Sequence, residues 1–364
     1  MSSRSPRIVR SRFRVSRGGV ALVAAAGLVL AAGCSDRVAG PDGDLAAESR
    51  RSGGDSATAT PPVAGTPGSQ PGAGSQLAGM RFWVDPNSRP AAQAAAWRGS
   101  RPADAAQMDK IAAQAQAQWF GDWTPEPRAE VDGVVRAATA AGRVPVLVAY
   151  NIPQRDCGGY SANAQTVDGY RRWIAAFAAG IAGRRAVVIL EPDALADLDC
   201  LSVGDRATRV GLLREAVRLL AAQPGTLAYL NAGHAEWQPA ATMASQIREV
   251  GTAGLAGFAL NVSNFVGTAA SLAYGDRIGG ALGGMHYLID TSRNGLGPTA
   301  DRQWCNPPGR ALGDRPTAAT GSPLADAYLW VKAPGESDGS CGGAPAAGEW
   351  MASYALGLAQ RAGY

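Results

Sequence analysis

The stretch that decides the fold is VVILEPD, which runs from Val187 to Asp193. Its first four residues are apolar and three of them are β-branched, which predicts a strand buried on both faces, as in a parallel sheet. Pro192 has no N–H to donate, so the strand is expected to end there. Asp193 would then lie at the mouth of a core strand, where α/β folds place their chemistry.

Further apolar runs of similar length predict more strands. With the run above, the expected strands are Arg81–Val84, Val146–Tyr150, Ala186–Glu191, Leu227–Asn231, Gly257–Asn261, His286–Asp290 and Ala327–Val331, and a short one is expected to start at Trp119. Helices are expected at Pro127–Ala141, Val167–Gly180, Arg206–Ala222 and Ala240–Val250. Strands that alternate with helices indicate an α/β fold with a parallel sheet. About seven such units favour a barrel over an open sheet.

Residues 1–33 have the features of an export signal. Six arginines and no acid lie in the first 17 residues, and the apolar stretch that follows is too short for a stable membrane span. The small residues before Cys34 resemble a bacterial lipobox, which implies cleavage there and lipid on the Cys34 sulfur. The alternative is a plain signal peptide followed by a chance cysteine. In either case we expect a secreted, extracellular protein, anchored to the outer face of the cell membrane if Cys34 is acylated.

The signal accounts for the basic character of the chain. The full sequence has 34 Lys and Arg against 30 Asp and Glu, a net charge of +4. Six of the basic residues leave with the signal, so 28 remain against 30 acids and the mature protein is close to neutral. The charge therefore gives no support for nucleic-acid binding.

Two segments follow the signal. Residues 34–78 are rich in Gly, Pro, Ser, Ala and Thr and contain no aromatic residue, which predicts a disordered tether that cannot bury a core. Residues 79–364 are long enough for one large α/β domain, which we expect to be monomeric.

Four cysteines remain when Cys34 is set aside. An exported chain favours disulfides, and four cysteines allow three pairings. We favour Cys157–Cys200 and Cys305–Cys341, because each closes a loop that follows a strand end. A zinc site is the rival interpretation, but no CxxC or His-rich spacing supports it. No metal and no cofactor are expected.

Polar residues gather directly after the predicted strands. They include Asn151, Arg155, Asp156, Glu191, Asp193, Asn231, His234, Trp237, Asn264, Arg293, Lys332, Glu336 and Asp338. If the strands are parallel, these side chains converge on one mouth of the barrel. Paired carboxylates suit glycoside cleavage, because the leaving oxygen needs a proton from an acid whose pKa is raised. Trp faces stack on sugar rings, and polar side chains bind the hydroxyls.

Two of these strand ends resemble the signatures of glycoside hydrolase family 6. They are VAYNIPQRDC at 148–157 and VVILEPDAL at 187–195, and five further stretches match in order, at 232–234, 257–264, 290–295, 304–309 and 330–339. The resemblance spans residues 79–364. It implies a distorted, TIM-like, seven-stranded parallel (β/α) barrel and a cellulase that cuts β-1,4-glucan with inversion. The two disulfides of the family match the pairing favoured above.

The resemblance also implies roles for individual residues. Asp193 matches the general acid, and Asp156 matches a neighbouring carboxylate that raises the pKa of the acid and helps to organise the attacking water. Asp338 matches the position usually proposed as the base. The matching substrate-binding residues are Tyr150 under the distorted sugar, Lys332 and Glu336 beside the cut, and His234, Trp237, Asn264, Arg293 and Trp304 along the cleft.

One position departs from the family pattern. Asn231 stands where the family usually has Asp, in a position that contributes to sugar binding and to the charge of the active site. This loss of charge favours an alternative function, a glucan-binding surface lipoprotein with little turnover, whereas the intact Asp156, Asp193 and Asp338 favour the enzyme. The short stretch from Gly335 to Trp350 predicts an open cleft and internal chain cutting.

Several other residues have plainer interpretations. Glu191 is expected to be a buried structural acid paired with a base, and Asp197 and Asp199 to be acids on a loop surface. Trp330 and Trp350 are expected in the core, where large aromatic residues are usually buried.

Overall fold

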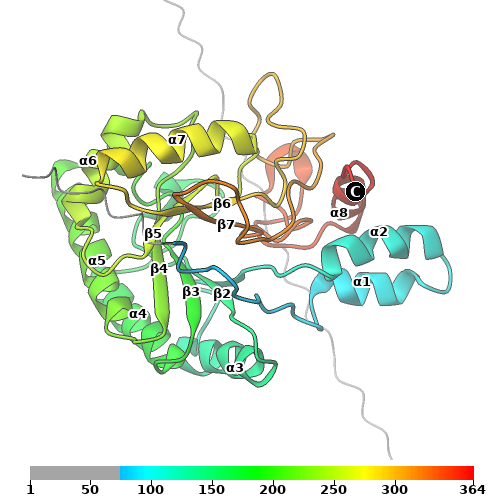
Figure 1. Cartoon of the computed structure of the whole chain (residues 1–364), viewed down its shortest axis with the longest axis horizontal. Coiled ribbons are helices and arrows are strands. Elements are labelled where there is room, and N and C mark those ends of the chain that lie inside the picture. Colours follow the sequence, from blue (N-terminus) through cyan, green and yellow to red (C-terminus); the bar gives the residue numbers. More distant parts are fainter. Residues whose placement is uncertain (1–73) are drawn as a thin grey trace, which may run out of the picture. The chain divides into compact units, whose positions relative to one another are not determined.

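The computed structural model describes residues 74–364. The expected signal peptide, the lipidation site Cys34 and the tether as far as residue 73 lie outside the described residues. Seven parallel strands form one sheet in chain order, and Figure 1 shows the sheet curling with its helices outside. The strands are β1 Gln118–Phe120, β2 Val146–Ala149, β3 Ala186–Leu190, β4 Thr226–Asn231, β5 Gly257–Leu260, β6 Tyr287–Asp290 and β7 Ala325–Leu329.

Eight α-helices accompany these strands within residues 74–364. They are α1 Arg89–Trp97, α2 Pro102–Ala112, α3 Pro127–Ala140, α4 Val167–Ile181, α5 Val203–Ala221, α6 Ala240–Val250, α7 Thr268–Ala281 and α8 Ala352–Gln360. Helices α3 to α6 follow one another around the outside of the strands (Figure 1). None of the helices described combines the length and the hydropathy that crossing a bilayer requires.

The barrel is distorted where its first and last strands meet. Beyond β1 and β7, Gln116 and Trp330 form a single parallel bridge. The Ala117 N–H donates to the Trp330 carbonyl at 3.0 Å, and the Trp119 indole N–H donates to the Val331 carbonyl at 2.8 Å. A single bridge in place of a full ladder confirms the expected distorted seven-stranded parallel barrel.

The apolar run of β3 faces two cores, as its sequence predicts. Val187 and Ile189 pack inside the barrel, whereas Val188 and Leu190 pack between the sheet and the helices. Alternate residues of a strand point to opposite faces, so a strand covered on both sides must be apolar throughout.

The prediction of a strand at Arg81–Val84 was wrong. Only Phe82 pairs there, in an isolated parallel bridge with Val144. From Leu147 onward the same edge of β2 is occupied by β1, whose Gln118 is the partner of Leu147. The first strand of the barrel is therefore Gln118–Phe120, close to the short run expected at Trp119.

Helix α7 was not predicted, because its glycines hide the helical pattern. A Cβ at Gly275 would lie 2.5 Å from the Tyr287 ring, and one at Gly279 would lie 2.5 Å from the Met285 carbonyl oxygen. The close approach of α7 to β6 therefore requires glycine, at a cost of about 1 kcal/mol each in helix propensity.

Helices α1, α2 and α8 were also not predicted. They pack together beside the barrel through a small core that includes Ala94, Met108 and Leu358 (Figure 1). The folded part begins ahead of the expected residue 79, since Leu77 is fully buried among residues of the barrel interior. The pairing Cys157–Cys200 and Cys305–Cys341 is confirmed, which removes the cysteines from any zinc site.

Candidate active site

A cavity of about 960 Å³ lies at the carboxyl ends of the strands. Segments that follow all seven strands line it, so the convergence predicted from the parallel sheet is found. The predicted site residues that line the cavity are Tyr150, Asp156, Asp193, His234, Trp237, Asn264, Trp304, Lys332, Glu336 and Asp338.

Glu191 joins the ends of β2 and β3 beneath this cavity. Its buried carboxylate accepts hydrogen bonds from the backbone N–H groups of Asn151, at 2.9 Å, and Ile152, at 3.1 Å. Burial raises the pKa of Glu191 to about 7, although these backbone N–H groups favour its charged form. Glu191 is the structural acid expected, but its hydrogen-bond partners are backbone amides rather than a basic side chain.

Asp193 enters the cavity from a strained turn. Its φ is 69°, a left-handed conformation that costs free energy in a residue other than glycine. The Asp193 N–H donates to the Asn231 side-chain oxygen at 2.9 Å, which holds the turn in place. Burial, and then the negative charges of Asp197 and Asp156, raise the pKa of Asp193 to about 8. Asp193 is therefore protonated at neutral pH.

Asp156 lies beside Asp193 on the loop after β2, also with a positive φ of 56°. Its carboxylate accepts hydrogen bonds from the Ser161 N–H at 2.8 Å and from the Ser161 hydroxyl at 3.0 Å. That hydroxyl is also 2.8 Å from the Tyr150 hydroxyl. A Cβ at Gly159 would lie 2.6 Å from the Asp156 carboxylate, so a larger residue there would displace that carboxylate.

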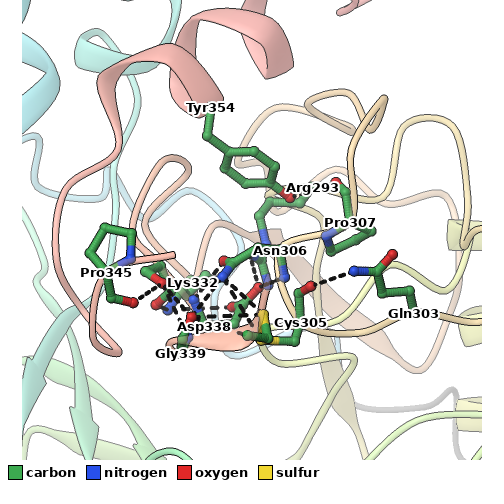
Figure 2. The surroundings of a disulfide bond; sticks show 12 residues. Arg293, Gln303, Cys305, Asn306, Pro307, Lys332, Asp338, Gly339, Pro345 and Tyr354 are labelled. Atoms are coloured by element: carbon green, nitrogen blue, oxygen red, sulfur yellow. Dashed lines mark hydrogen bonds and ion pairs between the residues drawn. A yellow bond between two sulfur atoms is a disulfide. The ribbon is translucent and has the colours of Figure 1, made fainter. Parts of the chain in front are cut away.

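Asp338, in the segment after β7, has the opposite charge state and lines the same cavity. Figure 2 shows Arg293, Asn306 and Lys332 around its carboxylate, next to the Cys305–Cys341 disulfide. The Arg293 guanidinium donates at 2.9 Å, the Asn306 N–H donates at 3.0 Å, and the Lys332 ammonium lies at 3.6 Å. Burial alone would raise the pKa of Asp338, but Arg293 and Lys332 outweigh it and hold that pKa below its ordinary value.

Two predicted residues lie beneath the cavity rather than along it. Arg293 is fully buried with its guanidinium 4.4 Å from the Phe265 ring, so the expectation that it lines the cleft was wrong. Its guanidinium forms an ion pair with Asp338, because a buried carboxylate requires a paired cation. Asn231 is also buried, and its side-chain oxygen accepts from the Asp193 and Gly233 N–H groups. Asn231 therefore stabilises the turn that carries Asp193 through a hydrogen bond.

Aromatic side chains form the walls of the cavity. Trp123, Trp237 and Trp304 are 54%, 38% and 47% exposed, which is unusual for indole side chains, and all three line the cavity. Trp237 packs against His234, with 5.4 Å between the ring centroids. Burial, and then Arg302, lower the pKa of His234 to about 4, so its ring is neutral at pH 7.

The sequence interpretation missed several residues of the cavity. Asp197 lines it, contrary to the expectation of an acid on a loop surface. Trp350 packs against the core of α1, α2 and α8, as expected, but it also lines the cavity. Ser161, Trp119 and Trp123 also line it. The spacing of four between Asp193 and Asp197 was an available signal, since one helical turn after Pro192 places both on the same side. Within residues 74–364, His, Cys, Asp and Glu form no group of three that could hold a metal ion.

An acid whose pKa is raised and an acid whose pKa is lowered thus face a single cavity walled by indoles. A family model described as "Glycosyl hydrolases family 6" matches residues 77–362 of this sequence. The chain belongs to glycosyl hydrolase family 6. The resemblance stated from its motifs is thereby confirmed.

Curated and solved relatives within the family carry related names. Endoglucanase A of Cellulomonas fimi is 46% identical over 284 residues, which cover 77% of this chain and 61% of that protein. Endoglucanase 1 of Streptomyces halstedii is 42% identical over 272 residues, covering 72% of this chain and 82% of that protein. The chain thus spans about six tenths of the length of the first of these relatives.

A solved structure of the endoglucanase Cel6 from Mycobacterium tuberculosis superimposes with a TM-score of 0.76 and 45% identity. The match covers 79% of this chain and 99% of that one. That protein was solved in complex with methyl-cellobiosyl-4-deoxy-4-thio-β-D-cellobioside. The family fold is thus shared by the described part of this chain.

Proposed function

We propose that this chain is an inverting endo-β-1,4-glucanase that cuts internal bonds of cellulose or a related β-glucan. The observation that supports this most strongly is the opposite titration of two carboxyls in one cavity. The pKa of Asp193 is raised to about 8 and that of Asp338 is lowered. Titratable groups whose pKa values are pushed apart by their environments are candidates for the acid and the base of a reaction.

In the proposed mechanism, Asp193 protonates the leaving glycosidic oxygen while water attacks the anomeric carbon from the opposite face. Asp156 and Ser161 orient that water, and the ionised Asp338 supplies the negative charge that its deprotonation requires. Tyr150 lies under the distorted sugar, and Lys332 and Glu336 bind the hydroxyls beside the cut. A single displacement of this kind inverts the anomeric configuration.

The walls of the cavity support a glucan as the substrate. Partly exposed indoles can stack on the apolar faces of successive glucose rings. The lining carries more acids than basic residues, including Asp85, Glu236 and Glu349, so its charge gives no support for a polyanion as the natural substrate. The relatives named as endoglucanases and the thio-oligosaccharide held by the neighbour structure support internal cutting of a β-1,4-glucan.

The test is product analysis of the mature domain on carboxymethylcellulose and mixed-linkage β-glucan. We expect a fast fall in viscosity with few new reducing ends, and an α-anomer as the first product in proton NMR. Asp193→Ala should lower the rate at least 10²-fold, whereas Asp199→Ala, which removes a neighbouring exposed acid, should not. Binding to a cellulose column without hydrolysis would overturn the enzyme proposal in favour of a glucan-binding lipoprotein.

We also propose that the protein is secreted as a monomer and is tethered to the outer face of the membrane through Cys34. The basic and apolar pattern of residues 1–33 supports export. The two disulfides support an oxidising compartment. Labelling with radioactive palmitate should mark the wild-type protein and not Cys34→Ala. Equal labelling of both, or of neither, would argue against the anchor.

A further inference from the structure

Asp197 is a third carboxylate on the acid side of the cavity. It lies one turn after Asp193, and its N–H donates to the Asp193 carbonyl at 2.9 Å. Its side chain is half-buried and lines the same cavity as those of Asp156 and Asp193. Three carboxyls from two loops therefore share one space.

A disulfide and a buried arginine connect the loops that carry Asp156 and Asp197. The Cys157–Cys200 disulfide joins the residue after Asp156 to the short turn that follows Asp197. From below, the buried Arg209 on α5 donates to the Pro153 and Gln154 carbonyls at 2.9 and 2.7 Å, and to the Ala194 carbonyl at 3.4 Å. The loops cannot separate without breaking these contacts, so the approach of the three acids is built into the fold.

The charge of this cluster is not neutralised by an ion pair. In contrast, Asp338 pairs with Arg293 and Lys332, and the exposed Asp199 lies 3.8 Å from Arg206. Among the ion pairs within residues 74–364, none includes Asp156, Asp193 or Asp197. Three carboxylates that line one cavity without a paired cation disfavour one another's ionised form, because like charges repel.

The remaining charged and titratable groups that face Asp193 and Asp197 are few. From the loop after β2 come Tyr150 and Asp156, which face Asp193, and Asp156 also faces Asp197. From α5, Arg209 faces Asp197. His234, from the end of β4, lines the cavity as a neutral ring at pH 7. The balance around the cluster is therefore negative.

We propose that Asp197 is a positioning residue for the catalytic proton: with Asp156 it obliges the cluster to keep one proton, and it thereby sets the alkaline limit of the reaction. This inference rests on the proposed function, in which Asp193 is the general acid. Asp197 acts on Asp193 through space and does not itself bind the sugar that is cut.

The titration of the cluster agrees with this arrangement. Burial, and next Asp197 and Asp156, raise the pKa of Asp193 to about 8. Burial and Asp156 raise the pKa of Asp197 itself to about 6, against the opposing charge of Arg209. At neutral pH the proton of the cluster therefore resides on Asp193, where the mechanism needs it.

The test compares the pH dependence of kcat/KM on mixed-linkage β-glucan for the wild type and three variants. The alkaline limb is the part of the profile where kcat/KM falls as the pH rises. Asp197→Asn should lower its apparent pKa by about one unit, which corresponds to a tenfold loss of kcat/KM at pH values above it. Activity at pH 5 should change less than about threefold. Asp197→Glu should restore the wild-type limb, and Asp199→Asn should leave it unchanged. An alkaline limb that does not move in Asp197→Asn would overturn the inference.

A direct titration separates this inference from the proposed function. Carbon-13 NMR of labelled aspartate carboxyls, with the Asp193 signal assigned by its loss in Asp193→Asn, measures the pKa of Asp193 without any substrate. A wild type that hydrolyses no glucan would refute the function, yet a fall in the Asp193 pKa in Asp197→Asn would still support the coupling. An active enzyme with an unchanged Asp193 pKa would refute the coupling alone. Asp197→Ser serves as the second variant if Asp197→Asn does not fold.

Discussion

Asp193 and Asp338 face one cavity from the ends of β3 and β7, and their pKa values move in opposite directions. Asp193 lies among acids, with no paired cation, and its proton is retained. Asp338 contacts Arg293 and Lys332, and its charge is retained. The same residue type thus takes two roles because its neighbours differ.

The first prediction concerns the pH profile of hydrolysis. Asp193 acts in its protonated form, so activity should fall as the pH rises through about 8. Asp338 acts ionised and its pKa is lowered, so the acid limb should lie below the ordinary aspartate value of about 3.9. Initial rates on a neutral oligosaccharide between pH 3 and 10 measure both limbs. An alkaline limb below pH 6 would contradict the assignment of Asp193.

The second prediction concerns Asn231, which stands in place of the usual family Asp. Its amide group donates to the Ala259 carbonyl at 3.5 Å while its oxygen accepts from the Asp193 N–H. In Asn231→Asp, a carboxylate would add negative charge under Asp193 and raise the alkaline limb by up to about one pH unit. It would also face the Ala259 carbonyl without a proton to donate, so the melting temperature should fall by about 2–4 °C.

Rates as a function of pH and a thermal melt of Asn231→Asp measure both effects. Asn231→Ala is the matched control, because it loses the acceptor for the Asp193 N–H without adding charge. A loss of rate with no shift of the limb is expected for that variant. Equal profiles for the two variants would show that charge at this position does not matter.

The third prediction concerns Arg293. Arg293→Met leaves the buried Asp338 with Lys332 alone, so the pKa of Asp338 should rise and the acid limb should move up by more than about one pH unit. Breaking a buried pair costs about 3–5 kcal/mol, measurable by denaturant unfolding. In the wild type the pair stabilises the fold above the unfolded pKa of about 3.9, and this stabilisation is lost as the pH falls through the lower folded value.

Arg206→Met is the control for Arg293→Met. Arg206 is partly exposed and pairs with Glu249 at 3.1 Å on the surface. Its loss should cost less than about 1 kcal/mol and leave both limbs in place. An equal loss of unfolding free energy in the two variants would mean that the buried Arg293–Asp338 pair stabilises the fold no more than a surface ion pair does.

The fourth prediction separates the two disulfides. They close loops of 43 and 36 residues, so removing either should cost a similar amount, about 4 kcal/mol. Their kinetic effects should differ. The double variant Cys305→Ser/Cys341→Ser loosens Asn306, which hydrogen-bonds to Asp338, and should disturb the acid limb. Cys157→Ser/Cys200→Ser loosens the Asp156 and Asp197 loops and should disturb the alkaline limb. The same change in both variants would point to a general loss of stability.

Local sequence was sufficient for most of the barrel. The unbroken apolar run of β3 predicts a strand covered on both faces, because each of its residues packs in one of two cores. The helical stretches between the strands predict α3 to α6, with Ala240–Val250 matching α6 at both ends. The local sequence pattern failed where contacts with residues distant in the chain decide the structure. Arg81–Val84 has the pattern of a strand, but β1 already occupies that edge of β2. Helix α7 carries glycines that are explained by its close contacts with Tyr287 and Met285.

The sequence by itself determined that the segments after the strands converge on one mouth of the barrel, because parallel strands end at one edge. Only the tertiary structure decided which of their side chains line the cavity, which are buried beneath it, and which carboxyls are protonated. Arg293 and Asn231 lie below the cavity while Asp197 lies inside it, since burial and pairing depend on neighbours distant in the chain. A pKa is set by those neighbours and by exclusion of water, and neither property belongs to a residue or to its local sequence.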